Sequence, residues 1–372
     1  MVRSFKSRPR IAIVGAGAIG LACARALLVR GVEVVVFDRN RAGQGASWAA
    51  AGMLAPAAEA LEEGTQSAEA VAFGLESLAV WPDWAAELSA ETGVDLSLRM
   101  PGALLPVFDV EEAAGLPARA EAARALGAAV DVLDAAEARA REPALHESVR
   151  GALHMPGEGV VDPRALCAAL AASVRSHGGA LVEHAEVQTV EPGPTPALAV
   201  RGEGETSRKS FDLVVIASGW RAGALASVAP PLDAVVPVKG QLLAVDASGL
   251  ALGGVIRRPG VYVIPRPDGR IIIGATAEPG RSDLDVDPVA SEALHAAAAE
   301  IVPALADAPV VDGWTGVRPG LAASHAASGP IVAWAAENVL AAVGHYRNGV
   351  LLAPATGARI AEMAAAAGLT ED

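Results

Sequence analysis

Three glycines and one aspartate near the N-terminus have a spacing typical of nucleotide binding. Gly15, Gly17 and Gly20 form the pattern Gly-x-Gly-x-x-Gly, and Asp38 follows at the end of a second apolar run. In such a turn the first glycine permits the tight bend, the second lets the backbone approach a pyrophosphate, and the third lets a helix pack closely on a strand. The acid accepts hydrogen bonds from a ribose diol. These residues therefore predict a dinucleotide site, and a glycine-rich turn without a ligand is the alternative.

The segments around these residues have the patterns that would position them. Residues 11–14 and 32–37 are apolar runs typical of buried parallel strands, and residues 21–30 have a helical pattern that ends at Gly31. Strand, turn, helix, strand and acid therefore follow one another in the order of a βαβ unit. The N-terminus of the helix would present free N–H groups and a partial positive charge to the phosphates. We expect this unit to begin an α/β domain with a Rossmann-like sheet.

The residues after Asp38 distinguish between dinucleotides. In an NAD domain this stretch would run quickly into another helix, whereas residues 39–53 are a long run of small side chains, suited to a backbone that lies along an extended cofactor. Together with the preceding unit, the motif Gly-x-Ser-x-x-Ala-Ala-Gly-Met at 45–53 resembles the N-terminal signature of the D-amino acid oxidase superfamily of FAD-dependent oxidoreductases. That superfamily more often has Glu at the position of Asp38, and either acid serves the ribose.

Three segments in the last third of the chain carry a more specific resemblance. Residues 260–276 are two β-rich runs around a Pro-Asp-Gly turn, which predicts a hairpin. The loop 316–320, Gly-Val-Arg-Pro-Gly, and the run 343–357, which contains His-Tyr-Arg-Asn-Gly, follow in this order. Together they resemble the glycine oxidases of thiamine biosynthesis, a branch of the same superfamily. The similarity extends from about Arg10 to the C-terminal helix and is thin between Leu61 and Arg150.

The resemblance implies an α/β fold with two domains. A Rossmann-like FAD-binding domain would be discontinuous and would take residues 10–60, 150–230 and 315–368. A substrate-binding domain of α+β type, with a mixed and mainly antiparallel sheet, would take residues 61–149 and 231–314.

The middle of the chain has helix and strand patterns without a catalytic constellation. Residues 54–150 are rich in Ala, Glu and Leu with helical spacing. Asp162 as N-cap and Pro163 in the first turn predict a helix that runs to about Ser176. Apolar runs predict strands over residues 181–190 and 211–216.

An amino acid oxidase must hold the carboxylate of a small zwitterion while its Cα–H points at flavin N5. A planar guanidinium can bind a carboxylate through two hydrogen bonds and stays charged when it is desolvated. The resemblance implies that Arg318 is this clamp, that Tyr262 adds a hydroxyl group, and that Arg347 lies close to the substrate and the flavin ring. All three are thereby implied to be catalytic and substrate-binding residues. From the residues alone, a surface salt bridge for Arg318 and a tyrosine packed in a sheet are the alternatives.

The resemblance also implies non-covalent FAD and the residues around it. Covalent attachment through a late cysteine is excluded because no cysteine follows Cys167. Val187 would lie against the adenine, and His345 would hydrogen-bond to the flavin ring or act as a general base. The helix after Gly349 would direct its N-terminus at the ring. The implied FAD-binding residues are Gly15, Gly17, Ala18, Ile19, Gly20, Asp38, Arg39, Ala46, Ser47, Ala51, Gly52, Met53, Val187, Ser218, Gly219, His345, Tyr346, Arg347, Asn348, Gly349, Val350 and Leu351.

Composition excludes several classes of protein. The chain has 372 residues, of which 52% are hydrophobic and 19% charged, so it is folded and long enough for two or three domains. A net charge of 29 − 43 = −14 argues against nucleic acid or an anionic membrane as a partner. The two cysteines exclude a disulfide scaffold and a cysteine-rich metal site and favour a reducing compartment. No apolar run is long enough for a membrane span. We expect a cytoplasmic protein without a metal, and the resemblance implies a homo-oligomer.

The resemblance implies oxidation of glycine or another small primary or secondary amino acid. Hydride would move from Cα to flavin N5 to give an imine, and dioxygen would then be reduced to hydrogen peroxide, in support of thiamine thiazole synthesis. A D-amino acid or sarcosine-type oxidase, or a dehydrogenase with another acceptor, is the enzymatic alternative, because the sequence does not give the size of the pocket. A flavin-binding module without catalysis is a third hypothesis. The presence of Tyr262, Arg318 and Arg347 together speaks against it.

Overall fold

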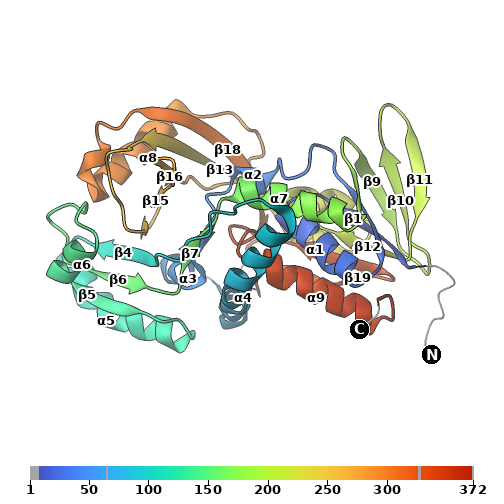
Figure 1. Ribbon diagram of the computed structural model, residues 1–372, viewed down its shortest axis with the longest axis horizontal. Helices are drawn as coiled ribbons and strands as arrows, with labels where there is room; N and C mark the ends of the chain where they lie inside the picture. The colour runs from blue at the N-terminus through green and yellow to red at the C-terminus, as the bar shows by residue number, and fades with distance from the viewer. Residues whose placement is uncertain (1–7, 64–65, 326–327, 371–372) are drawn as a thin grey trace.

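Two β-sheets organise the chain and lie in neighbouring halves of the molecule (Figure 1). The computed structural model describes residues 8–63, 66–325 and 328–370. A six-stranded sheet with its helices forms one half, and a nine-stranded sheet forms the other. Segments from the beginning, the middle and the end of the chain meet in the six-stranded sheet, so the polypeptide passes between the halves more than once.

The six-stranded sheet is built around the N-terminal βαβ unit. Its strand order is β19 (Ile331–Ala336), β20 (Val339–Val343), β12 (Leu213–Ile216), β1 (Arg10–Val14), β2 (Glu33–Phe37) and β8 (Ala180–Val182). Strand β1 runs parallel to β12 on one side and to β2 on the other. Ile11, Ala12 and Ile13 have no exposed surface, as expected for a parallel strand covered on both faces. The Rossmann-like part of the predicted fold is confirmed.

Helices cover one face of this sheet, and a small antiparallel sheet covers the other. The covering helices are α1 (Ala18–Val29), α4 (Ala68–Thr92), α7 (Pro163–Ser176) and α9 (Ala353–Ala366), which share one hydrophobic core. The small sheet consists of β9 (Glu186–Glu191), β10 (Ala197–Arg201) and β11 (Thr206–Ser210). Its residues Val190 and Leu198 pack with Val14 and Ile216 in a second core. Both faces of β1 are therefore buried.

The nine-stranded sheet is mixed and mainly antiparallel, as predicted. Strand β13 (Val235–Asp246) pairs with β18 (Val310–Leu321) on one side and with β16 (Arg270–Gly274) and β17 (Glu278–Pro279) on the other. The sheet continues through β15 (Val261–Pro265), β14 (Val255–Arg258), β4 (Ala103–Val107), β6 (Gly151–Met155) and β5 (Asp131–Asp134). Strands β14 and β4 run parallel, and β15 with β16 forms the predicted hairpin.

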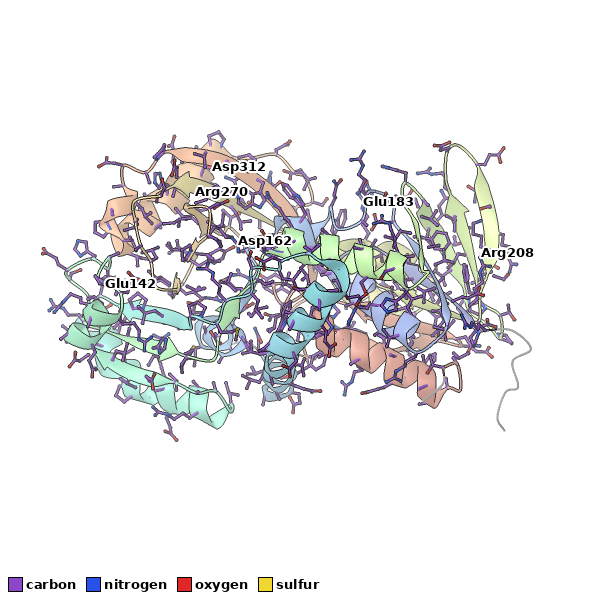
Figure 2. All side chains as sticks on the ribbon, viewed as in Figure 1. Glu142, Asp162, Glu183, Arg208, Arg270 and Asp312 are labelled. Carbon is purple, nitrogen blue, oxygen red and sulfur yellow. The ribbon has the colours of Figure 1, made fainter. Side chains whose placement is uncertain are left out.

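The two faces of the nine-stranded sheet belong to different cores. Leu243 of β13 packs with α6 (Ala135–Arg141) and α8 (Pro288–Ile301), whereas Leu242 packs with α3 (Pro56–Glu63) and α5 (Val110–Ala125). Side chains fill the space around both sheets, with the labelled Glu183 and Arg208 on the six-stranded half and Arg270 and Asp312 on the nine-stranded half (Figure 2). Further elements among the described residues are α2 (Ala46–Ala49), the pair β3 (Met53–Leu54) and β7 (Gly159–Val160), and the 3₁₀ helices Gly219–Leu225, Pro230–Ala234 and Pro303–Leu305.

Local patterns in the middle of the chain were informative only in part. The predicted helix is α7, and the Asp162 carboxylate accepts hydrogen bonds from the N–H groups of Arg164 and Ala165 at 2.8 and 3.1 Å. The helical prediction for 54–150 is wrong where β4 and β5 occur. There, pairing with neighbouring strands decides the structure, since β4 pairs with β6 and β14. The strand predicted over 181–190 is two strands of different sheets, because the chain turns at His184 with a φ of 55°.

The exact domain boundaries stay a prediction. Strand β6, which the prediction places in the FAD-binding domain, pairs with β4 and β5 in the nine-stranded sheet. Helix α4, which the prediction places in the substrate-binding domain, packs in the core of the six-stranded sheet. Each half therefore contains elements from the sequence range that the prediction assigns to the other.

Candidate active site

A cavity of about 540 Å³ is lined by residues of both halves. Its walls come from the glycine-rich turn after β1, the small-residue run 44–53, strands β13, β15 and β18, and residues 342–350. This volume lies within the range of pockets that bind small molecules and cofactors in proteins. The cavity is therefore the candidate site, and the predicted residues can be placed relative to it.

The backbone of the glycine-rich turn has no room for a side chain at its first and third glycines. Gly15 has a φ of 107°, and a Cβ atom there would lie 2.4 Å from the carbonyl oxygen of Ala217. A Cβ atom on Gly20 would lie 1.9 Å from the carbonyl oxygen of Gly15. The first glycine thus permits the turn, and the third permits the close approach of α1. Gly15 and Gly17 line the cavity, whereas Gly20 does not.

Two side chains connect this turn to the segments that follow it. The Asp38 carboxylate accepts hydrogen bonds from the N–H groups of Ala16 and Asn40, both at 2.8 Å. Ser47 Oγ accepts a hydrogen bond from the N–H of Ala18, the first residue of α1, at 2.9 Å. Burial raises the pKa of Asp38, while these hydrogen bonds oppose the shift. Asp38 lines the cavity and is placed to accept hydrogen bonds from a ribose.

Tyr262, Arg318 and Arg347 line the same cavity although they come from distant segments. Tyr262 lies on β15, Arg318 on β18, and Arg347 in the loop before α9. Burial raises the pKa of the Tyr262 phenol, although the fields of Arg318 and Arg347 act in the opposite direction. Burial lowers the pKa of Arg318, and the field of Arg347 adds to this. The chain therefore places a neutral phenol beside two guanidinium groups.

Glycines on neighbouring strands make room for the phenol and one guanidinium. A Cβ atom on Gly240 of β13 would lie 2.1 Å from Nη1 of Arg318, and a Cβ atom on Gly274 of β16 would lie 2.4 Å from the Tyr262 hydroxyl. Arg318 Nη1 also donates a hydrogen bond to the carbonyl oxygen of Thr276 at 2.9 Å. Sequence reasoning missed Gly240 because its role arises only from the pairing of β13 with β18.

Comparison with known proteins supplies the family. Residues 10–363 match the family model described as FAD dependent oxidoreductase. The chain belongs to this family. This FAD-dependent oxidoreductase is 36% identical over 364 residues to the glycine oxidase of Geobacillus kaustophilus (strain HTA426), with 95% of this chain and 92% of the relative covered. It is 34% identical over 363 residues to the bifunctional protein ThiO/ThiG of Synechocystis sp. (strain ATCC 27184 / PCC 6803 / Kazusa), with 95% of this chain but 51% of that protein covered.

The fold of this oxidoreductase also has close counterparts among solved structures. The crystal structure of glycine oxidase from Geobacillus kaustophilus matches with a TM-score of 0.88 and 34% sequence identity, with 98% of this chain and 96% of that chain covered. Glycine oxidase from Bacillus cereus ATCC 14579 matches with a TM-score of 0.84 and 29% identity, with 97% of this chain and 96% of that chain covered. The predicted α/β architecture with a Rossmann-like unit is confirmed.

The cavity of the oxidoreductase fits FAD, its family's cofactor. A turn without room for side chains, the start of α1 and an acid suited to a ribose lie along the same cavity as the phenol and the guanidinium groups. The residues predicted to bind FAD that line the cavity are Gly15, Gly17, Ala18, Ile19, Asp38, Arg39, Ala46, Ser47, Ala51, Gly52, Met53, Val187, Ser218, Gly219, His345, Tyr346, Arg347, Gly349 and Val350. Their individual contacts with FAD stay predictions.

Three of the predicted FAD-binding residues, Gly20, Asn348 and Leu351, do not line the cavity. Leu351 is buried against α4, where its carbonyl oxygen accepts hydrogen bonds from Ser77 Oγ at 2.7 Å and Trp81 Nε1 at 2.8 Å. Helix α9 begins at Ala353, so its first residues lie further along the chain than the prediction placed them.

His345 is a neutral imidazole in this oxidoreductase. Burial lowers its pKa to about 3, and Nε2 lies 3.1 Å from Oγ1 of Thr356. A group with so low a pKa accepts protons poorly at neutral pH. Of the two predicted roles, this favours hydrogen bonding over general-base catalysis.

Sequence reasoning also missed a buried ionic cluster next to the cavity. Glu59 of α3 is 4% exposed and lines the cavity. The guanidinium of Arg257, which is 2% exposed, contacts Glu62 Oε2 through Nε at 3.2 Å and Nη2 at 2.6 Å. Glu158 accepts hydrogen bonds from the N–H groups at the start of α3, and burial raises its pKa to about 7. No local motif marks these residues, because strands and helices far apart in the chain bring them together.

The other predictions concern absent features. In the part of the chain that the structure describes, no three His, Cys, Asp or Glu residues are grouped to hold a metal ion. Within the same residues, no helix combines the length and the apolar character that a membrane span requires. Cys23 and Cys167 are free and buried, and burial raises the pKa of each thiol to about 12.

Proposed function

We propose that this oxidoreductase oxidises glycine or another small primary or secondary amino acid to the imine, with dioxygen as electron acceptor and hydrogen peroxide as the second product. The observation that carries the proposal is the meeting of Tyr262, Arg318 and Arg347 in a cavity that continues to the nucleotide-binding turn. Similarity over nearly the whole chain to proteins named glycine oxidase supports it.

Arg318 is proposed to hold the carboxylate of the substrate. Its guanidinium is planar, stays charged when desolvated and can bind both carboxylate oxygens. The hydroxyl of Tyr262 adds a neutral donor, since burial keeps the pKa of this phenol raised. FAD, when bound, would be the oxidant and accept the hydride. The contribution of the two side chains is to fix the carboxylate, and thereby the direction in which Cα–H points.

The substrate must lose a proton from its ammonium group before the carbon-bound hydrogen leaves as hydride. Arg318 and Arg347 both line the cavity. Two nearby cations lower the pKa of a bound ammonium group and favour the neutral amine. His345, whose pKa is lowered to about 3, is not suited to take this proton at neutral pH. We therefore place the loss of the proton at binding and assign no general base.

The product is proposed to serve thiamine thiazole biosynthesis, as the resemblance in the sequence implies. The chain matches about half, 51%, of a protein named bifunctional protein ThiO/ThiG. In that protein this half is joined to a second one, which supports a pathway in which the product of the oxidation is used by a further reaction. We also propose that the chain is divided into an FAD-binding and a substrate-binding domain and that it self-associates. We further propose a cytoplasmic location, which the two free thiols support. Size-exclusion chromatography with light scattering tests the self-association.

Anaerobic titration of the purified FAD-loaded protein tests the reaction. Glycine, sarcosine and D-alanine are added separately while the absorbance of oxidised flavin is followed. The proposal predicts bleaching with glycine and formation of hydrogen peroxide on admission of air. Bleaching by D-alanine or sarcosine alone identifies the alternative oxidases, and bleaching without peroxide in air identifies a dehydrogenase. Absence of bleaching with all three substrates supports the flavin-binding module.

A further inference from the structure

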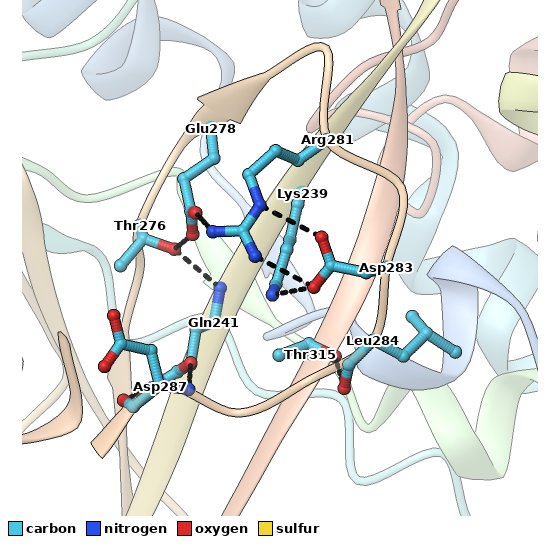
Figure 3. Close-up of polar contacts among 9 residues, drawn as sticks. All are labelled: Lys239, Gln241, Thr276, Glu278, Arg281, Asp283, Leu284, Asp287 and Thr315. Carbon is cyan, nitrogen blue, oxygen red and sulfur yellow. Dashed lines mark hydrogen bonds and ion pairs between the residues drawn. The ribbon is translucent and has the colours of Figure 1, made fainter. Parts of the chain in front are cut away.

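A loop of twelve residues, 276–287, crosses the ribbon formed by β13 and β18 and is called the strap here (Figure 3). It begins beside β13, where Pro279 and Glu278 pair with Val238 and Lys239. It then passes over both strands to reach Thr315 of β18, whose Oγ1 donates a hydrogen bond to the carbonyl oxygen of Leu284 at 2.7 Å. The strap thus spans the two strands that carry Gly240 and Arg318.

Alternation along β13 places Lys239 and Gln241 on the side of the strap. Successive residues of a strand point to opposite faces, and Gly240 and Leu242 line the cavity. Lys239 and Gln241 therefore point to the face away from the cavity. Gln241 fastens the end of the strap, because its amide donates to the carbonyl oxygen of Asp287 and accepts from the N–H of Asp287, both at 2.7 Å.

Lys239 holds the middle of the strap. Its side chain is 1% exposed, and its ammonium donates a hydrogen bond to Oδ1 of Asp283. The Asp283 carboxylate also accepts hydrogen bonds from Arg281, at 2.9 Å from Nε and 3.0 Å from Nη2. A buried ammonium requires such a partner, since an unpaired charge is costly to remove from water. Lys239 is therefore one of the contacts that fix Asp283, and it joins the middle of the strap to β13.

A continuous series of contacts leads from Lys239 to Thr276 (Figure 3), and a further hydrogen bond leads from Thr276 to the Arg318 guanidinium. Arg281 donates a hydrogen bond to Glu278 Oε2 at 2.5 Å, and Thr276 Oγ1 donates one to Glu278 Oε1 at 3.1 Å. The carbonyl oxygen of Thr276 then accepts a hydrogen bond from Arg318 Nη1 at 2.9 Å. Ser282 and Leu284, the two neighbours of Asp283 in the chain, line the cavity. Both the clamp and part of the cavity wall are thus attached to the strap.

We propose that Lys239 is a positioning residue of the active site: through Asp283 it holds the strap in place, and the strap in turn orients the Arg318 guanidinium and the wall formed by Ser282 and Leu284. This inference rests on the proposed function in that Arg318 is the carboxylate clamp. It assigns to Lys239 and Asp283, neither of which lines the cavity, an effect on carboxylate binding.

Asp283→Asn and Lys239→Met test the inference in the FAD-loaded protein. Each substitution removes one charge of the pair and keeps the approximate size of the side chain. Asp268→Asn is the matched control, because it removes a carboxylate bound to Arg270 in the same sheet, at a turn that does not line the cavity. Asp283→Glu restores the charge. If Lys239→Met fails to fold, Asp283→Asn decides alone, since its side chain is 36% exposed.

Two readouts separate a positioning role from a structural one. The dissociation constant of acetate, a carboxylate without an amine, is measured from the change in flavin absorbance, and KM and kcat are measured with glycine. Displacement of the clamp should raise the acetate constant and KM by about tenfold, with a smaller change in kcat and unchanged FAD content. Asp283→Glu should recover part of this loss, and Asp268→Asn should behave as the wild type.

The inference is overturned if, in Asp283→Asn, the dissociation constant of acetate and the KM for glycine both stay within about twofold of the wild-type values. A wild-type protein that does not bind acetate overturns it as well, because the clamp is then absent. If glycine does not bleach the wild-type flavin while Asp283→Asn still weakens acetate binding, the inference stands and the proposed substrate is wrong.

Discussion

The two ends of the cavity are built from the chain in different ways. The nucleotide end is lined mainly by one continuous part of the chain, from Gly15 to Met53, and at Gly15 and Gly20 the surrounding backbone leaves no room for a side chain. The substrate end consists of Tyr262, Arg318 and Arg347, which lie on separate segments and act through their side chains. Added volume at the tight glycines of the first end should therefore reduce stability and FAD binding. Changes of charge or direction at the second end should leave the fold and FAD in place and weaken substrate binding.

Gly20→Ala tests the nucleotide end and should have the largest effect. The added Cβ atom would lie 1.9 Å from the carbonyl oxygen of Gly15, which is backbone and has no flexible end to move aside. We expect a loss of stability of about 3 kcal/mol and loss of bound FAD. Thermal unfolding and the ratio of flavin to protein absorbance measure both.

Gly115→Ala is the matched control for this substitution. It also changes a glycine within a helix, α5, but no atom lies within 4 Å of the added Cβ. Alanine is the better helix former, so this variant should be at least as stable as the wild type and retain FAD. If Gly20→Ala and Gly115→Ala have the same stability and FAD content, close backbone approach at Gly20 is not what limits substitution at the nucleotide end.

Arg318→Ala tests the charge at the substrate end. A hydrogen bond to a charged group contributes about 1.5–3 kcal/mol, so kcat/KM for glycine should fall about tenfold to a hundredfold, while FAD stays bound. Arg318→Lys keeps the charge but loses the planar pair of donors, and it should recover only part of the loss. Steady-state kinetics and flavin content are the measurements. Normal KM and turnover in Arg318→Ala would reject the clamp.

Gly240→Ala tests direction without changing charge. Its Cβ atom would lie 2.1 Å from Nη1 of Arg318, the far end of a flexible side chain that can move away. The protein should fold and bind FAD, but KM for glycine should rise about tenfold because the clamp is displaced. Gly313→Ala on the paired strand β18, with Val286 Cγ1 3.8 Å from its Cβ as the nearest atom, should change KM little. A similar KM in both variants contradicts the steric role of Gly240.

The same difference explains how much could be predicted from the sequence. The βαβ unit, Asp38 and the motif 45–53 are contiguous, so their spacing alone indicates a dinucleotide, and the described structure places them along one cavity. Tyr262, Arg318 and Arg347 required a resemblance to known enzymes, because no local pattern shows that three segments meet. Gly240, Glu59 and Lys239 were missed altogether. Their roles arise from strand register and from packing of side chains across the sheet.

Errors in the predicted fold have a related cause. The helical prediction for residues 54–150 fails at Ala103–Val107, where Ala and Leu suggest a helix but pairing with β6 and β14 forms a strand. The break at His184 was invisible because neither Gly nor Pro marks it, although its φ is positive. Tertiary pairing decided the structure where local propensity was weak.

His345→Gln tests a residue of the loop that carries Arg347, and its expected effect is the smallest. Burial lowers the pKa of His345 to about 3, so between pH 6.5 and 3 the unfolded chain binds a proton that the folded chain does not. Stability should therefore fall as the pH decreases below 6.5, by about 1 kcal/mol at pH 5.5, and this loss should be absent in His345→Gln.

Glu158 changes the pH dependence of stability in the opposite direction. The effect of His345 is therefore measured as a difference between the wild type and His345→Gln. Burial raises the pKa of Glu158 to about 7, so the folded chain holds a proton that the unfolded chain releases above its ordinary pKa, and stability rises as the pH falls. Because both proteins share Glu158, the difference between their urea-unfolding free energies at pH 6.5 and 5.5 isolates His345. An equal change in wild type and His345→Gln would mean that the pKa of this imidazole is not lowered in the folded protein, so that it becomes a cation below its ordinary pKa.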